Sequence, residues 1–202
     1  MIIIIGAGGH AKVVADLLVA THSAVAGYLD DDPVTWNTVR VGVPVLGPIN
    51  SIIDYDPSGI VCAIGDNRTR HRIVNSLSPE LQARWINAIH PSAIIAPSAR
   101  LGIGVVVAAG AIINADAELH DHVIVNTGAT VDHDCVIASF AHVGPGCHIA
   151  GSVNIGEGAF LGIGSLVSPG RSVGQWSVIG AGATVIYDIP DHVIAKGTPA
   201  RW

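Results

Sequence analysis

An aliphatic residue recurs at every sixth position through the second half of the chain. The seventeen positions at this spacing from Ile89 to Val185 are all Ile, Leu or Val, with no slip or insertion. A small residue, usually Ala or Cys, lies two positions before nearly every aliphatic, and Gly or Asn often follows it. This period predicts a β-solenoid in which the aliphatic and small residues point inward. We expect left-handed backbone at the Gly and Asn positions, where it costs little.

The hexads sort the outward-facing residues into three columns, because three hexads make one triangular coil and residues 18 apart stack at the ~4.8 Å strand spacing. The columns are Arg100, Glu118, Val136, Asn154 and Ser172; Ile94, Ile112, Thr130, His148, Leu166 and Thr184; and Val106, Ile124, His142, Phe160 and Val178. The third column is an apolar stripe with one histidine, and an exposed apolar patch typically marks an interface. A three-sided prism favours a cyclic trimer. We therefore expect a homotrimer with His142 at the subunit boundary.

Residues 1–88 have the alternating pattern of a parallel sheet with crossover helices. Strands are predicted over 2–5, 25–29 and 60–64, and helices after residue 9 and over 68–77. Val13, Val14, Leu17 and Leu18 are predicted to form the buried face of the first helix. Only one mononucleotide half fits in this length. A single nucleotide, or a sugar carried on one, is therefore a better ligand than NAD.

A Gly6-x-Gly8 turn between the first strand and the first helix predicts where that ligand binds. Glycines let the backbone approach a phosphate, and the helix N-terminus favours negative charge. Asp30 and Asp31 follow the second strand, where a ribose or base contact is expected. His10 begins the helix and could touch the ligand or face water. The alternative is a tight turn that binds nothing.

The pentapeptide Val131-Asp132-His133-Asp134-Cys135 is the most polar corner of the solenoid. The period makes Val131 and Cys135 inward residues, so the three between them point outward, while Cys147 is a core residue like Cys135. The residues above and below His133 in the stack, Ala115 and Gly151, are small and leave room for a substrate. An imidazole held by a carboxylate is a good general base near pH 7. Either Asp132 or Asp134 could hold it, and Asp134 is preferred.

Two other interpretations of this corner stay open from the residues alone. One is a solvated turn without a function. The other is a metal site, for which His120, His122, His133, His142 and His148 are candidate ligands, although His120 and His122 lie at another corner.

Composition excludes several classes of function. The formal net charge of −6 argues against nucleic acid or an anionic membrane surface as a partner. No apolar run approaches the ~20 residues that cross a bilayer, and the N-terminus has no signal-peptide pattern. The three Cys form neither a disulfide framework nor a metal motif. We expect a cytoplasmic protein.

The sequence resembles the bacterial sugar O- and N-acyltransferases of the hexapeptide-repeat superfamily. The resemblance covers essentially the whole chain through IIGAGGHAKVV, YLDDD, AIGDN, NAIHPSA, NTGATVDHDC, HVGPG, FLGIGSLVSPG and KGTPA. It implies a Rossmann-like domain over 1–88, which binds a nucleotide sugar, and a left-handed β-helix over 89–202, which binds acetyl-CoA and is catalytic. It also implies acetyl transfer to the C4 amine of a nucleotide-linked 4-amino-4,6-dideoxy sugar, directly and without a metal.

The resemblance also implies roles for individual residues. His133 matches the general base and Asp134 its carboxylate partner. The residues that match acetyl-CoA contacts are His142, Gly151, Ile163 and Ala181. The residues that match the nucleotide-sugar pocket are Gly8, Gly9, His10, Asp30, Asp31 and Gly65.

Three alternative functions are weighed against this one. The first is O-acetylation of sialic acid or another sugar hydroxyl, which none of these residues distinguishes from N-acetylation. The second is a nucleotide-binding scaffold, which would need neither the outward Asp-His-Asp nor the histidine in the apolar stripe. The third is an NAD-linked oxidoreductase, which lacks its second half-domain.

Overall fold

The computed structural model describes residues 1–202, and the chain divides into two compact units, Met1–Pro91 and Ser92–Trp202. The sequence places the boundary three residues earlier, between 88 and 89. Strand β6 (Ala88–Ile89), which carries the first aliphatic of the period, therefore falls in the first unit.

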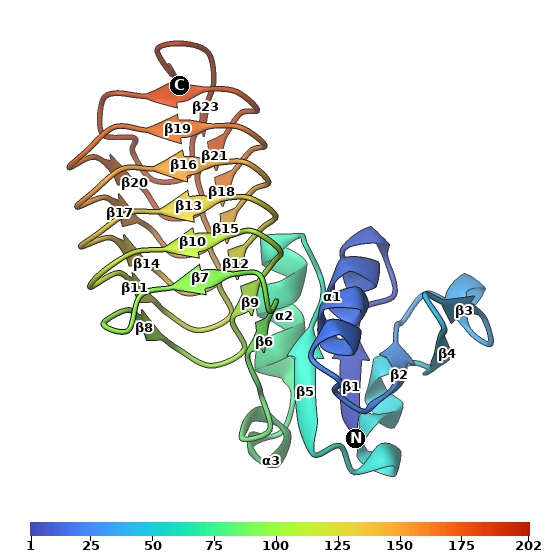
Figure 1. The fold of residues 1–202 in the computed structure, drawn as a ribbon. Coiled ribbons are helices and arrows are strands. Elements are labelled where there is room, and N and C mark those ends of the chain that lie inside the picture. Colours follow the sequence, from blue (N-terminus) through green and yellow to red (C-terminus); the bar gives the residue numbers. More distant parts are fainter. The chain divides into compact units, whose positions relative to one another are not determined.

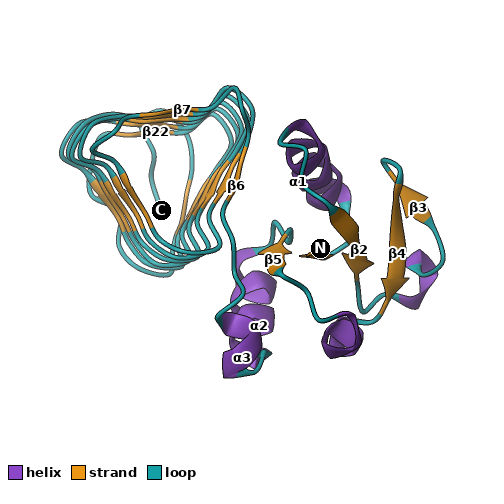
Figure 2. Ribbon diagram, turned by 60° about the horizontal axis from the view of Figure 1, so that its bottom comes forward, coloured by secondary structure: helices purple, strands orange, loops and turns teal.

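The first unit is a five-stranded sheet with helices. Its elements are β1 (Ile2–Ile5), α1 (Gly9–Ala20), β2 (Val25–Leu29), the 3-10 helix η1 (Pro33–Thr35), β3 (Val39–Arg40), β4 (Val43–Gly47), the 3-10 helix η2 (Ile49–Tyr55), β5 (Gly59–Cys62), α2 (Asn67–Ser76), α3 (Pro79–Gln82) and β6. The sheet has the order β3-β4-β2-β1-β5, and β1, β2, β4 and β5 pair in parallel. Figure 2 shows α1 on one face of this sheet and α2 with α3 on the other side.

The predicted strands and helices of this unit are present, with two differences. Strands β3 and β4, an antiparallel pair, were not predicted. Val13 is 40% exposed, whereas Val14, Leu17 and Leu18 are buried against the sheet. At about 100° per residue, Val14, Leu17 and Leu18 fall within one arc of about 100° around the helix, and Val13 lies outside that arc.

The second unit is a solenoid of two-residue strands in three sheets (Figure 1). The first sheet holds β7 (Ile94–Ile95), β10 (Ile112–Ile113), β13 (Thr130–Val131), β16 (His148–Ile149), β19 (Leu166–Val167) and β22 (Thr184–Val185). The second sheet holds β8 (Arg100–Leu101), β11 (Glu118–Leu119), β14 (Val136–Ile137), β17 (Asn154–Ile155) and β20 (Ser172–Val173). The third sheet begins with β6 and also holds β9 (Val106–Val107), β12 (Ile124–Val125), β15 (His142–Val143), β18 (Phe160–Leu161), β21 (Val178–Ile179) and β23 (Ile194–Ala195).

The strands stack in parallel with the register that the period predicts. Val131 pairs with Ile113 on one side and with Ile149 on the other, each 18 residues away. The solenoid is triangular when viewed along its axis (Figure 2). The predicted fold class, a Rossmann-like domain joined to a left-handed parallel β-helix, is confirmed.

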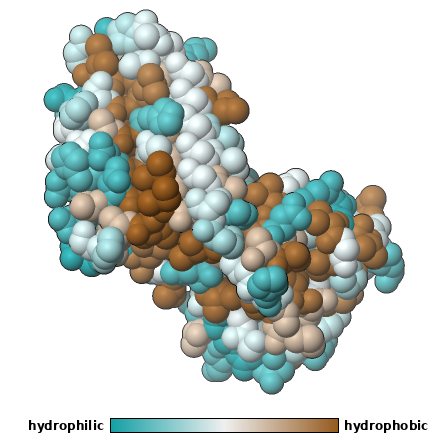
Figure 3. Space-filling view, viewed as in Figure 1, coloured by the Kyte–Doolittle hydropathy of each residue, from teal (hydrophilic) through white to brown (hydrophobic).

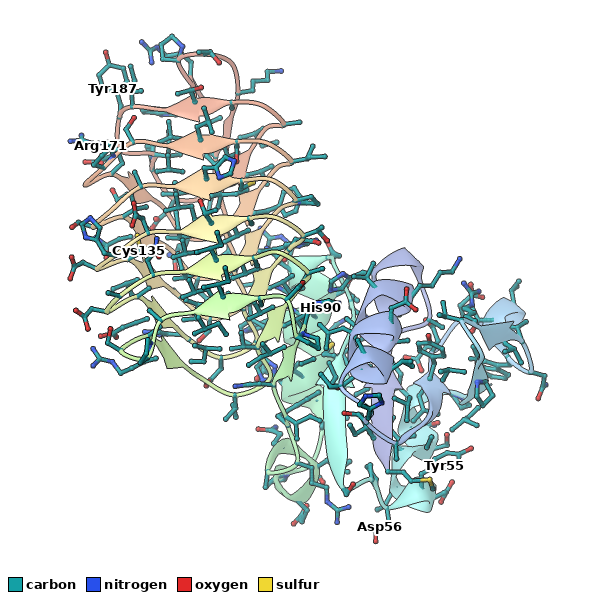
Figure 4. All side chains as sticks on the ribbon, in the orientation of Figure 1. Tyr55, Asp56, His90, Cys135, Arg171 and Tyr187 are labelled. Atoms are coloured by element: carbon teal, nitrogen blue, oxygen red, sulfur yellow. The ribbon has the colours of Figure 1, made fainter.

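The inward residues form the core of the solenoid. Val131, Ile137 and Val143 are completely buried, as are the small inward residues Cys135 and Cys147 (Cys135 is labelled in Figure 4). All three cysteines of the chain are free thiols. Cys135 and Cys147 are therefore core residues, as predicted.

Left-handed backbone lies at a different hexad position from the one expected. The third residue after the aliphatic, not the first, has positive φ in fourteen successive hexads, between +55° at Trp176 and +68° at Gly110. The glycines directly after the aliphatics are needed because the next coil approaches closely. A Cβ on Gly144 would lie 2.3 Å from the carbonyl oxygen of Leu161. This correction places Asp134, with φ of +57°, at a left-handed corner.

The third outward column is not the exposed apolar stripe that the sequence suggested. Val106, Ile124 and His142 keep only 1%, 0% and 7% of their surface, and Phe160 and Val178 are half-buried. Two apolar side chains of the first sheet are instead exposed, Ile94 at 63% and Leu166 at 42%. Figure 3 shows apolar patches over this face, with hydrophilic side chains between them. No helix of the structure is both long and apolar enough to cross a membrane.

Glycines with left-handed backbone and glycines close to the next coil should differ in how much stability the protein loses when they are replaced by alanine. Gly146→Ala should destabilise the solenoid by roughly 1–2 kcal/mol, the cost of left-handed backbone, since a Cβ there meets nothing within 4 Å. Gly144→Ala should cost more, because its Cβ meets a backbone oxygen that cannot move away. Thermal unfolding of the two variants checks this order. If Gly144→Ala lost no more stability than Gly146→Ala, close approach of the next coil would not be the reason for glycine at residue 144.

Candidate active site

A cavity of about 330 Å³ in the first unit contains all six residues predicted for the nucleotide-sugar pocket. Its lining comprises Gly6, Gly8, Gly9, His10, Asp30, Asp31, Ile49, Ala63, Ile64, Gly65, Thr69, Arg72 and Ile73. These residues come from the ends of β1, β2 and β5, from the starts of α1 and η2, and from α2. Ligands of parallel α/β sheets bind at this edge, outside the carboxyl ends of the strands.

The two aspartates of the pocket hold its loops by different means. Asp30 accepts hydrogen bonds from the backbone N–H groups of Ala7 at 2.6 Å and Asp32 at 2.8 Å, one on each carboxylate oxygen. Asp31 uses one oxygen, Oδ1, to accept from the N–H of Ile49 at 3.0 Å. Asp30 therefore fixes the loop after β1, and Asp31 is the aspartate better placed to accept a hydrogen bond from a ligand.

Two arginines that the sequence analysis did not single out belong to this site. Arg72 lines the cavity and can neutralise a phosphate. Arg70 is 1% exposed, and its guanidinium donates to the carbonyl oxygens of Ile64 and Gly65 and to Oδ1 of Asn67. Arg70 thereby fixes the loop between β5 and α2. The only feature of the sequence that points to this role of Arg70 is its spacing of three residues from Asn67, which is a weak signal.

His10 is a neutral member of the pocket. Burial, and then the positive charge of Arg70, lower the pKa of His10 to about 4. The imidazole is therefore uncharged at pH 7, so it can exchange hydrogen bonds with a ligand but adds no positive charge for a phosphate.

His133 and Asp134 form a hydrogen-bonded pair on the solenoid surface. Nδ1 of His133 lies 2.7 Å from Oδ2 of Asp134, and the two side chains are 58% and 60% exposed. The left-handed backbone of Asp134 turns its side chain back toward its neighbour. A carboxylate can only accept, so Nδ1 carries the hydrogen and Nε2 is left with its lone pair facing outward as a base.

Asp132 contacts the backbone and Asn114 and not the imidazole of His133. Its Oδ1 accepts from the backbone N–H of His133 at 2.8 Å and from the amide of Asn114 at 3.0 Å. The hydrogen bond to Asp134, followed by the charge of Asp132, raises the pKa of His133 above its ordinary value. Of the two candidate partners, Asp134 is the one that holds the imidazole.

The four residues matched to acetyl-CoA contacts divide between two places on the chain. Gly151 shares the corner between the first and second sheets with His133 and Asp134, and we call this the His133 corner. Ile163 and Ala181, both exposed, lie one coil apart at the corner between the third and first sheets, which we call the Ile163 corner. The two corners border opposite edges of the first sheet, so one chain does not bring the groups together.

His142 lies on the third sheet, next to the Ile163 corner. Its Nε2 accepts from the Nδ2 amide of Asn126 at 3.1 Å, and its ring meets Phe160 edge-on at a centroid distance of 5.2 Å. This arrangement fixes the ring and leaves the hydrogen on Nδ1. His122, a candidate metal ligand from the sequence, is instead buried and stacks on Phe140. The structure contains no group of three His, Cys, Asp or Glu side chains that could hold a metal ion.

Comparisons with known proteins point to one family. Residues 1–77 match the family model described as the PglD N-terminal domain. A histidine variant of perosamine N-acetyltransferase from Caulobacter crescentus, solved in complex with CoA and GDP-perosamine, is 44% identical; the match covers 99% of this chain and 95% of that one, with a TM-score of 0.92. The acetyltransferase domain of PglB from Neisseria gonorrhoeae, solved with acetyl coenzyme A, is 38% identical over 99% and 97% of the two chains, with a TM-score of 0.90.

One curated protein is also similar over part of its length. Uncharacterized protein L142 of Acanthamoeba polyphaga mimivirus is 36% identical over 118 residues, which are 58% of this chain. The chain spans only 23% of the length of that protein.

The hydrogen bond between His133 and Asp134 predicts a pKa difference between two variants. Asp134→Asn should lower the pKa of His133 more than Asp132→Asn does, because the first replaces the charged acceptor of the ring's hydrogen bond by a neutral one and the second loses only a nearby charge. A proton–carbon NMR titration of the His133 ring measures both values. A pKa in Asp134→Asn that equals or exceeds that of the unmodified protein would rule out Asp134 as the partner.

Proposed function

The chain belongs to the hexapeptide-repeat sugar acetyltransferases that carry a PglD N-terminal domain, and on that premise we propose which sugar atom it acetylates and which residues do so. It is an acetyltransferase that takes its acetyl group from acetyl-CoA and passes it to a nucleotide-linked amino sugar. We propose that the acceptor is the C4 amine of a 4-amino-4,6-dideoxy sugar. The observation that carries this proposal is the carboxylate-held imidazole of His133, on a chain similar throughout its length to a perosamine N-acetyltransferase.

The proposed mechanism is direct transfer. Nε2 of His133 takes a proton from the sugar amine as its nitrogen attacks the thioester carbonyl. The tetrahedral intermediate then collapses, the carbon–sulfur bond breaks, and the protonated imidazole returns the proton to the leaving thiolate. The products are the N-acetyl sugar and free CoA. The burial of all three cysteines, Cys62, Cys135 and Cys147, supports this route, because no thiol is exposed to carry an acyl group.

Two chains would supply one active site. His133 and Asp134 lie at one edge of the first sheet, and His142, Ile163 and Ala181 lie at or beside the other. We propose a cyclic homotrimer in which the His133 corner of one subunit faces the Ile163 corner of the next. Acetyl-CoA would lie in the groove between these corners. Holding the thioester against the amine would contribute much of the rate acceleration.

The first unit would bind the nucleotide. The N-terminus of α1 and the side chain of Arg72 would meet the diphosphate, while Asp31 would accept from the ribose or base. His10, being neutral, would act through a hydrogen bond. A cytoplasmic location, expected from the sequence, stays a prediction.

His133→Ala should lower acetyl transfer by at least ~100-fold, because the amine then loses its base. The assay incubates acetyl-CoA with a panel of nucleotide-linked 4-amino sugars and with sialic acid, and detects released CoA thiol and acetylated product. His22→Ala, at an exposed site in the first unit, is the matched control. Turnover of sialic acid with none of any amino sugar would overturn N-acetylation, and an undiminished rate in His133→Ala would overturn the base.

Arg72→Ala should raise the KM for the nucleotide sugar about ten- to a hundred-fold and leave the KM for acetyl-CoA unchanged. The expected size is that of one lost hydrogen bond to a charged group. Arg84→Ala is the control, since Arg84 pairs with Asp56 and does not line the cavity. An unchanged KM for the nucleotide sugar would remove Arg72 from the site.

A further inference from the structure

Gly151 is the only glycine at its position in the hexad repeat. The other fourteen residues at this position from Pro97 to Ala181 are Pro97, Ile103, Ala109, Ala115, Asp121, Thr127, His133, Ser139, Pro145, Glu157, Ile163, Pro169, Gln175 and Ala181. Their variety indicates that the corner accepts side chains of many shapes. The φ angle of Gly151 also lies outside the left-handed region. The backbone therefore does not require glycine there.

The imidazole of His133 accounts for the glycine. A Cβ built on Gly151 would lie 2.5 Å from both Cε1 and Nε2 of His133 and 3.1 Å from Nδ1. All three contacts are to this one ring. Gly151 is buried although the side chain of His133 is 58% exposed, which fits a ring lying against the bare Cα.

Backbone hydrogen bonds hold the two residues at this separation. The N–H of Ser152 donates to the carbonyl oxygen of His133 at 2.9 Å, and the N–H of Gly170 donates to that of Gly151 at 3.0 Å. The coil that carries Gly151 therefore cannot move away to admit a larger side chain. The ring is confined between this coil on one side and the carboxylate of Asp134 on the other.

We propose that Gly151 is a positioning residue for the general base. Its missing side chain leaves the space in which the imidazole of His133 lies while Nδ1 binds Asp134 and Nε2 points toward the acceptor. This inference rests on the proposed role of His133. It gives Gly151 a different task from the backbone contact to acetyl-CoA that the family resemblance implies.

A methyl group at residue 151 should displace the imidazole of His133 and leave the folding of the solenoid intact. Ordinary contact needs at least 3.4 Å, so the ring must move by about 1 Å. The ring is the far end of an exposed side chain and can swing into solvent at little cost. That movement breaks the hydrogen bond to Asp134. Alanine already occupies the same hexad position at residues 109, 115 and 181, so the coil should tolerate it.

The test is Gly151→Ala, with Gln175→Ala as the control at the same hexad position on another corner. We expect the pKa of His133, measured by NMR titration without substrates, to fall in Gly151→Ala and to stay unchanged in Gln175→Ala. We also expect kcat to fall at least tenfold in Gly151→Ala, with the KM for acetyl-CoA within about threefold of the unmodified enzyme. Its midpoint of thermal unfolding should shift by only a few degrees.

Three outcomes would overturn the proposal, two of them in Gly151→Ala. One is an unchanged pKa of His133 in Gly151→Ala. The other is a raised KM for acetyl-CoA with an unchanged kcat, which would leave only the cofactor contact. A nuclear Overhauser effect between the α protons of Gly151 and Hε1 of His133 tests the contact in the unmodified protein, and its absence would also overturn it. The NMR measurements need no turnover, so they separate failure of this inference from failure of the proposed acetyl transfer.

Discussion

The stacking of each hexad on the one 18 residues away is the constraint on which the rest of the structure depends. Parallel pairing fixes which residues lie above and below one another, as it does for Val131 between Ile113 and Ile149. The inward aliphatic and small residues fill the prism, so the remaining residues of a hexad lie at a corner or on a face. A corner can therefore hold catalytic side chains without disturbing the core, provided that the corner residues in the adjacent coils are small enough to leave space for those side chains.

At the His133 corner, the hexad repeat places the residues that hold and orient the imidazole of His133. The left-handed residue of each hexad is Asp134 in this one, which brings its carboxylate to Nδ1 of His133. The carboxylate of Asp132 accepts instead from Asn114 in the preceding coil and from the backbone N–H of His133. Gly151, one coil further on, leaves the space for the ring. Three of the four residues matched to acetyl-CoA, His142, Ile163 and Ala181, lie at or beside the opposite edge of the first sheet, which is why the proposed site needs two chains.

The sequence predicts the parts of the fold that depend on periodicity. Register, inward residues and the outward direction of His133 all follow from the period of six. Asp134 was favoured over Asp132, but only the left-handed corner gives the physical reason.

Three features of the structure could not be predicted from the period of six. The left-handed residue is the third after each aliphatic, because close approach by the next coil selects glycine at the first. Val106 and Ile124 are covered, which depends on tertiary packing. Arg70 and Arg72 reach their loops only once α2 is placed.

The central claim is that the active site is shared between two subunits, and mixed trimers of two variants, each altered in a different half of the proposed site and expected to be inactive alone, test it most directly. Chains carrying His133→Ala and chains carrying His142→Ala would be assembled together under two affinity tags and purified through both. A cyclic trimer containing both chains has one site of three with both halves intact, so acetyl transfer should recover to about a third of the unmodified rate. His133→Ala mixed with Asp134→Ala is the control and should not recover. Doubly tagged trimers of the first pair that remain inactive would contradict the shared site.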